Sequence, residues 1–114
     1  MAKTYQSKKA KGKRLELKVA QIIRQQLGIK AVRMPLSGAA GGELSGDIFC
    51  QELPFYFELK NQEKPHLWKW WQGIRDKKNP VLIISGNNRP ILAVCDLEMF
   101  LWLVKSLLVV KNLK

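Results

Sequence analysis

GDIFCQELPFYFELK, residues 46–60, carries an aspartate near its start and an E-x-K motif at its end. Its Ile, Phe and Tyr content favours β-strands, which we expect at residues 47–51 and 55–60. Residues two apart along a strand share one face of the sheet, so Glu58 and Lys60 project to the same side while Asp47 opens the neighbouring strand. This stretch therefore predicts two carboxylates and one ammonium group close together in a β-sheet.

Such a group of side chains is chemically suited to phosphodiester hydrolysis. Carboxylate oxygens can hold a hard divalent cation, and an ammonium group beside them can offset the negative charge that develops on a phosphate. Taken alone, an E-x-K motif is also compatible with an ordinary cross-strand ion pair, which contributes little to stability. The aspartate on the preceding strand favours the catalytic interpretation.

The charge of the chain indicates a polyanionic partner. Its 114 residues include 20 Lys+Arg and 9 Asp+Glu, a formal net charge of +11. Residues 1–33 contain ten basic residues and one acidic residue, which places +9 in this segment and +2 in the remaining 81 residues. We interpret residues 1–10 as a disordered basic arm that lies along a phosphate backbone. A solubilising tail is the alternative.

The remaining composition excludes several kinds of protein. Cys50 and Cys95 have no CxxC spacing and His66 is the single histidine, so neither a disulfide framework nor a zinc site is expected. The apolar segment at residues 99–110 is interrupted by Lys105 and is shorter than the roughly 18 residues of a membrane span. We therefore expect one soluble domain over residues 1–114, with no membrane partner and no small-molecule cofactor. We expect it in the cytoplasm, at the nucleoid or in an infected host cell.

The hydrophobic pattern predicts an α/β fold. Helical periodicity covers residues 12–27, 66–77 and a last helix that Asp96 caps. Strand patterns cover residues 30–35, 47–51, 55–60, 81–85 and 90–95. The order α-β-β-β-α-β-β-α predicts a mixed sheet flanked by helices. The apolar stripe of the first helix consists of Leu15, Val19, Ile22, Ile23 and Leu27.

Glu16 has an unusual position for a charged residue. At about 100° per residue it falls within the apolar arc of the first helix, so its carboxylate points toward the core. An unpaired buried carboxylate is costly, and a metal ion or a basic partner removes that cost. The alternative is that Glu16 lies in the first helical turn and interacts with the helix dipole.

Four short motifs occur in the order of a known nuclease family. They are Lys11-Gly12 with Glu16, Arg33 with Ser37-Gly38, Gly46-Asp47, and Glu58-Leu59-Lys60. In this combination residues 11–62 resemble the archaeal-type Holliday junction resolvases of the PD-(D/E)xK nuclease superfamily, and residues 66–104 are similar in the order of elements. The resemblance implies a restriction-endonuclease-like αβββαβ core and Mg²⁺ dependence, with Mn²⁺ as a substitute. It also implies a homodimer that cuts two strands of branched DNA.

The resemblance further implies an active site. The catalytic residues that it carries over are Glu16, Asp47, Glu58 and Lys60, with Ser37 as an additional catalytic or phosphate-contacting residue. The oxygen ligands that we then expect around Mg²⁺ are the carboxylates of Asp47, Glu58 and Glu16 and the carbonyl of Leu59.

Two departures from the family pattern concern the loop before Asp47. Gly46 stands where the superfamily most often has proline, although glycine also permits a tight entry into the strand. The loop from Ser37 to Gly46 is rich in glycine rather than basic, which leaves two alternatives to junction cleavage. One is a nuclease of the same superfamily acting on nicked, flapped or linear duplex DNA; the other is a nucleic-acid-binding module without catalysis.

Basic and aromatic side chains are candidates for DNA contact. Tryptophans interleaved with lysines offer stacking surfaces, whereas helical spacing places Trp71 in the core. Gln62 and Gln72 are candidates for contact with the phosphate or water, with simple solvent exposure as the alternative. The last helix is apolar on nearly every side, which predicts dimerisation. The predicted DNA-binding residues are Lys8, Lys9, Lys11, Lys13, Arg14, Arg33, Lys64, Trp68, Lys69 and Trp70.

Overall fold

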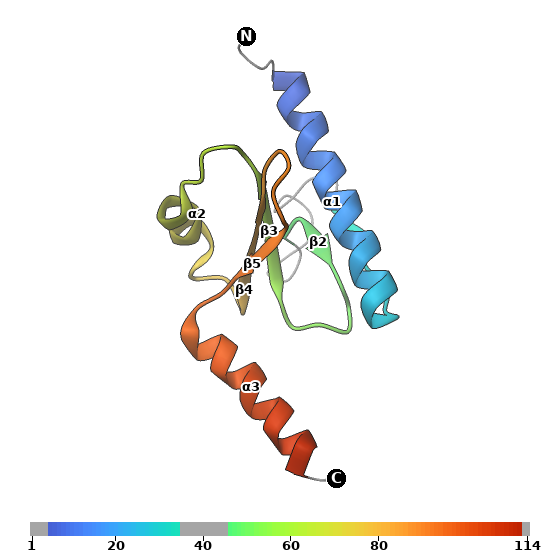
Figure 1. Ribbon diagram of the computed structural model, residues 1–114, viewed down its shortest axis with the longest axis vertical. Coiled ribbons are helices and arrows are strands. Elements are labelled where there is room, and N and C mark those ends of the chain that lie inside the picture. Colours follow the sequence, from blue (N-terminus) through green and yellow to red (C-terminus); the bar gives the residue numbers. More distant parts are fainter. Residues whose placement is uncertain (1–4, 35–45, 113–114) are drawn as a thin grey trace.

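A mixed five-stranded sheet with three helices forms the structure, a computed structural model that describes residues 5–34 and 46–112 (Figure 1). The elements are α1 (Tyr5–Leu27), β1 (Val32–Arg33), β2 (Ile48–Phe49), β3 (Tyr56–Asn61), α2 (Leu67–Ile74), β4 (Pro80–Ser85), β5 (Leu92–Val94) and α3 (Leu97–Asn112). The strand order is β1-β2-β3-β4-β5, with β3 and β4 parallel and the other neighbours antiparallel. The predicted α/β class and restriction-endonuclease-like arrangement are confirmed.

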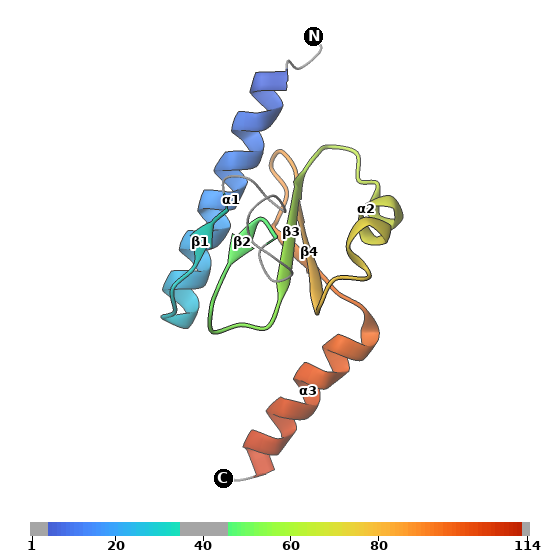
Figure 2. The same cartoon turned by 180° about the vertical axis from the view of Figure 1, so that it is seen from behind.

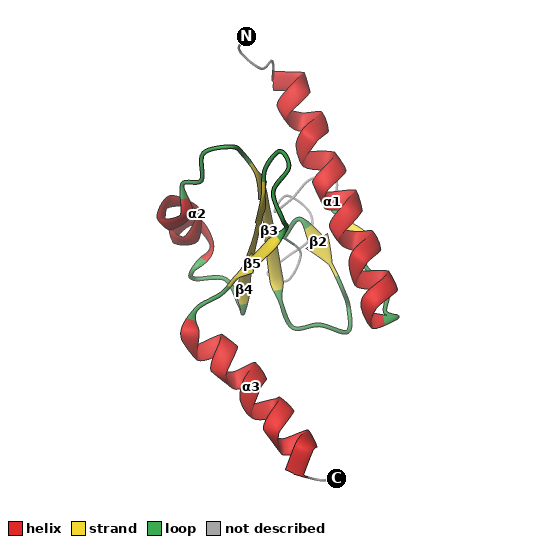
Figure 3. Cartoon of the chain, viewed as in Figure 1, coloured by secondary structure: helices red, strands yellow, loops and turns green. Residues whose placement is uncertain are grey.

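The two faces of β3 belong to two different layers. Figures 2 and 3 show α1 and α2 on opposite sides of the sheet. Phe57 and Leu59 pack in the cluster that α1 covers, and Tyr56 packs in the cluster on the α2 side. Because side chains alternate along a strand, Glu58 and Lys60 share the face of Tyr56.

α1 begins earlier than predicted, because residues 5–10 are helical and not a disordered arm. The hydrophobic periodicity predicts a helix from about Gly12, yet residues 5–10 contain Lys, Gln and Ala, which favour helices, and no proline. Gly12 is tolerated inside the helix at the usual cost of about 1 kcal/mol. Two members of the predicted apolar stripe, Ile22 and Leu27, are exposed, whereas Leu15 and Val19 are buried.

α3 projects away from the sheet (Figures 1 and 2). Its predicted N-cap is confirmed, since the Met99 N–H donates to Asp96 Oδ1 at 2.8 Å. Met99 is buried in the core, but most of the helix is not covered. Within the described residues, no helix has both the length and the apolarity needed to cross a bilayer.

Candidate active site

The strand register places Asp47 opposite Glu58. Ile48 of β2 pairs with Phe57 of β3, and both side chains lie in the core cluster under α1. In an antiparallel pair the next residues, Asp47 and Glu58, also face one another, on the opposite side of the sheet. The Asp47 N–H donates to the Phe57 carbonyl at 2.7 Å, which joins the two strands at this end, and the Asp47 and Glu58 side chains are hydrogen-bonded to one another.

Gly46 makes the close approach of the two strands possible. Its φ of +53° lies in the left-handed region, where side chains are disfavoured. A Cβ atom at this position would lie 2.5 Å from the Phe57 carbonyl oxygen, which is a backbone clash. Glycine is therefore required immediately before Asp47, and proline, with φ fixed near −65°, cannot adopt this conformation.

The carboxylate of Asp47 is held by the edge of β3. The Leu59 N–H donates to Asp47 Oδ2 at 2.7 Å. Leu59 lies past Phe57, the residue of β3 that pairs with the short β2 strand. The N–H groups of Tyr56 and Gln62 donate toward the β4 side of β3. Alternate residues of a strand form their backbone hydrogen bonds with the same adjacent strand, so the backbone groups of Leu59 point to the other side. The Leu59 carbonyl consequently faces the same edge as its N–H, beside Asp47.

Glu58 has the most perturbed pKa of this group. Burial, the charge of Asp47 and a hydrogen bond with the Asp47 side chain raise the pKa of Glu58 to about 7, although the charge of Lys60 lowers it. Lys60 Nζ lies 3.8 Å from Glu58 Oε2, and the two side chains are 33% and 22% exposed. One nearby ammonium group therefore does not compensate two adjacent carboxylates, and the site favours an additional cation.

Glu16 points inward, as predicted, and has a basic partner. Arg33 Nε lies 3.5 Å from Glu16 Oε2, with side chains that are 20% and 13% exposed. Arg33 Nε has no well-directed hydrogen bond, so the contact is chiefly electrostatic. Burial and then the charge of Asp47 raise the pKa of Glu16, and Arg33 lowers it.

The residues present fit a hard divalent cation at Asp47 and Glu58. Mg²⁺ is commonly held by one or two carboxylates, with water and phosphate oxygens completing its shell, and a cation would relieve the repulsion that raises the pKa of Glu58. Among residues 5–34 and 46–112, no three His, Cys, Asp or Glu side chains form a group that could hold a metal. Glu16 is thus not brought into a three-carboxylate site, and its metal role stays a prediction.

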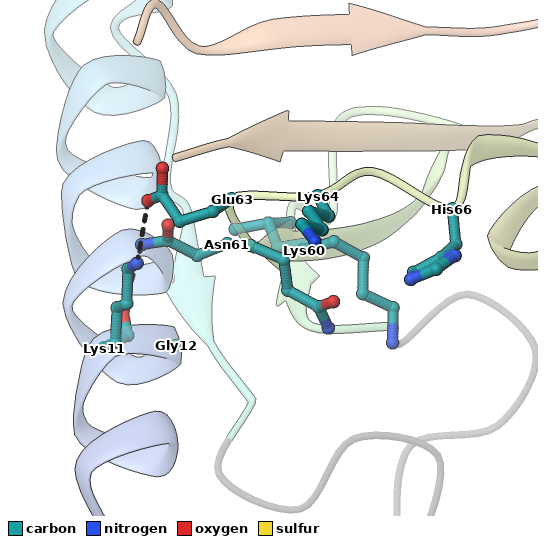
Figure 4. Close-up of a pocket in the computed structure, with 9 residues that line it drawn as sticks. Lys11, Gly12, Lys60, Asn61, Glu63, Lys64 and His66 are labelled. Carbon is teal, nitrogen blue, oxygen red and sulfur yellow. Dashed lines mark hydrogen bonds and ion pairs between the residues drawn. The ribbon is translucent and has the colours of Figure 1, made fainter. Parts of the chain in front are cut away.

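A pocket of about 410 Å³ adjoins Lys60 at the end of β3. Figure 4 shows Lys60 and His66 on one side of it, while Lys11 and Glu63 meet at α1 on the other. Lys11 Nζ lies 3.3 Å from Glu63 Oε1, and the Lys11 side chain is only 13% exposed. Lys11 is therefore largely engaged within the protein, and Glu63, which no sequence motif indicated as a site residue, holds it there.

The other predicted site residues are distributed around these groups. Trp68 is 78% exposed, whereas Trp70 is half-buried against the core and meets the His66 ring edge-to-face. Ser37 lies outside the described residues, and Lys8 is in α1. The residues that are exposed at the surface are Lys9, Lys13, Arg14, Gln62, Lys64, Lys69 and Gln72. Their predicted contacts with DNA or water stay predictions.

Comparisons with known proteins relate this chain to a family of phage nucleases. Residues 7–111 match the family described as "Phage putative PDDEXK endonuclease". The chain is also similar to Protein D14 of Escherichia phage T5, with 32% identity in an alignment 110 positions long; the match covers 75% of this chain and 69% of that protein. No solved structure matches the chain significantly. The chain therefore belongs to the phage PDDEXK endonuclease family and is a nuclease of the PD-(D/E)xK superfamily.

Proposed function

We propose that this nuclease is a Mg²⁺-dependent DNA endonuclease that cuts four-way junctions as a homodimer, with Mn²⁺ able to replace Mg²⁺. The observation that carries the metal dependence is the placement of Asp47 opposite Glu58, with Lys60 Nζ 3.8 Å from Glu58. A negatively charged pair beside an ammonium group is suited to a cation and a phosphate together.

Each side chain has a distinct role in this proposal. Asp47 and Glu58, with the Leu59 carbonyl, would hold the cation, and the chemistry that it would supply when bound is polarisation of the scissile phosphate and a lower pKa for water. Lys60 orients the water and offsets charge on the phosphate. Glu16 supplies a further carboxylate next to Asp47, and Ser37 contacts the phosphate.

The preference for branched DNA rests on the resemblance to junction resolvases and on the basic character of α1. Glu16 is the sole acidic residue of α1, and it faces Arg33. Seven of the other residues of this helix are basic. Cleavage of nicked, flapped or linear duplex by the same chemistry is the second candidate, and a non-catalytic binding module is the third.

Cleavage of matched substrates separates these three candidates. Purified protein with Mg²⁺ is expected to cut a labelled four-way junction at least about tenfold faster than the linear duplexes that form its arms. Both substrates are compared at the same salt concentration, because DNA affinity depends steeply on salt. Equal rates on both would favour the second candidate, and no product from any substrate would favour the third.

The raised pKa of Glu58 predicts a pH-dependent stability in the absence of metal. The ionised form is disfavoured in the folded protein, so the contribution is fully present below pH 4.5 and is lost as the pH rises through about 7. We expect a loss of about 2 kcal/mol in the free energy of unfolding across this range, after allowance for solvent screening. Urea titrations of wild-type protein and Glu58→Gln measure it.

The Glu58→Gln variant isolates this effect from other titrating groups. Its free energy of unfolding is expected to change less than that of the wild type between pH 4.5 and 7.5, because the ionisable group is gone. Saturating Mg²⁺ is expected to flatten the wild-type curve as well. Parallel curves for the two proteins without metal would show that Glu58 titrates normally.

A further inference from the structure

We propose that a polar groove between α1 and the β4–β5 turn binds the phosphate backbone of a second DNA segment, apart from the segment at Asp47 and Glu58. The groove has a volume of about 350 Å³ and no carboxylate lines it. Its polar lining is formed by Arg14, Lys18, Asn61, Ser85, Asn88 and Arg89. The inference rests on the proposed function, since it assigns the second segment to one branched DNA substrate.

Three exposed cations converge on this groove from two elements. Arg14 and Lys18 are four residues apart on α1 and so lie on the same face of the helix. Like charges at this spacing repel one another and do not stabilise the helix, whereas a bound phosphate backbone would offset both. Arg89 enters from the β4–β5 turn and is also exposed.

The spacing of Arg14 and Lys18 suits a DNA backbone. The two residues are four positions apart along α1, a distance of about 6 Å at 1.5 Å per residue. That distance corresponds to about two steps of 3.4 Å along one DNA strand. Arg14 and Lys18 can therefore contact neighbouring phosphates of one strand.

The wall opposite α1 is a defined turn. The Arg89 N–H donates to the Gly86 carbonyl at 3.3 Å, and Asn88 has a φ of +56°. The Glu63 carboxylate ties this turn to α1, because its Oε1 accepts from the Asn87 N–H at 2.7 Å and lies 3.3 Å from Lys11 Nζ. The spacing between the two walls is thus set before DNA binds.

The groove and Glu58 lie on different faces of β3, because Asn61, which lines the groove, alternates with Glu58 and Lys60 along the strand. Glu16 lies on the other flank of α1 from the groove. Leu15 and Val19 face the sheet; at about 100° per residue, Arg14 and Lys18 point to one side of them and Glu16 points to the other. Glu16 meets Arg33 of β1, whereas Figures 1 and 2 both place the β4–β5 turn beside the N-terminal half of α1. The groove and the proposed cation site are therefore on different surfaces, which suits two separate DNA segments.

The chemistry of the lining favours a duplex backbone over unpaired bases. Guanidinium, ammonium, amide and hydroxyl groups bind phosphate and sugar, whereas single strands are typically held by stacking on aromatic rings. No aromatic side chain lines this groove.

A binding experiment with two matched double variants tests the proposal. One variant is Lys18→Ala/Arg89→Ala, and the control, Lys30→Ala/Lys78→Ala, removes two exposed lysines that do not line the groove. Both are made in an Asp47→Asn background and measured without divalent cation, so that binding is observed without cleavage. Fluorescence anisotropy gives the Kd of a labelled four-way junction and of a linear duplex with one arm's sequence, over a range of salt concentrations.

The groove variant is expected to bind the junction roughly 10–30-fold more weakly at physiological salt, with the slope of log K against log salt reduced by about 2. The Kd of this variant for the linear duplex should stay within about threefold of the value for the parent protein. For the control variant, the Kd values for the junction and for the duplex should both stay within about threefold of those of the parent. Equal weakening for both DNAs, or weakening for neither, would overturn the proposal. Because this comparison needs no hydrolysis, a failure of the wild-type protein to cut DNA would leave it valid.

Discussion

Replacement of Asp47 by asparagine is expected to lower the rate of Mg²⁺-dependent DNA cleavage by a factor on the order of a thousand or more. The amide oxygen can still accept the hydrogen bond that the Leu59 N–H now donates to Asp47 Oδ2, so the strand pairing survives. What is lost is the negative charge opposite Glu58, and with it the pair that we propose to hold the cation. Single-turnover rates on a labelled junction, at saturating protein, measure the chemical step separately from binding.

Asp76→Asn provides the matched control for this prediction. Its side chain is 93% exposed and its neighbour is Arg75, at 4.0 Å, so it removes the same charge from a position without a proposed role. We expect this variant to cleave at a rate within about twofold of the wild type. A rate for Asp47→Asn within tenfold of the wild type would exclude Asp47 as a necessary metal ligand.

Leu107→Lys is expected to convert a dimer into a monomer. Nine large apolar side chains of α3 are exposed, namely Leu97, Phe100, Leu101, Trp102, Leu103, Leu107, Leu108, Val109 and Val110. A helix that is apolar on nearly all sides is normally buried, and monomers rarely expose contiguous apolar patches larger than a few hundred Å². Leu107 is 66% exposed, so lysine at this position fits the monomer but places a charge in an interface formed by α3.

Gln25→Lys adds the same charge on a different helix. Gln25 is an exposed residue of α1 and has no role in the proposed site. Sedimentation velocity over micromolar concentrations is expected to show a dimer for the wild type and Gln25→Lys, and a monomer for Leu107→Lys. A wild-type monomer, or a Leu107→Lys dimer, would contradict the role that we give to α3.

Much of the fold was predictable because local patterns and tertiary structure agree. Alternation and apolar runs located β3 and β4 to within one residue at each end, and Asp96 marked the start of α3 through its capping side chain. The exceptions depend on context. β1 and β2 are only two residues long, since strand length is decided by pairing with a neighbour and not by composition.

The sequence predicted only part of the candidate site. Alternation predicts that Glu58 and Lys60 share a face, but the placement of Asp47 opposite Glu58 depends on register, which a sequence of this kind does not specify. The requirement for Gly46 depends on the nearby Phe57 carbonyl, and the contacts of Glu63 join residues 52 and 24 positions apart. Such long-range contacts leave no local signal in the sequence.

The most direct test of the central claim is the titration of the Glu58 carboxyl by ¹³C NMR, with and without Mg²⁺. If Asp47 and Glu58 share a cation site, Glu58 should titrate near pH 7 in the metal-free protein, and saturating Mg²⁺ should displace that titration to lower pH. Titration close to 4.5 that is unaffected by Mg²⁺ would contradict the account, because the two carboxylates would then neither repel one another nor bind the ion.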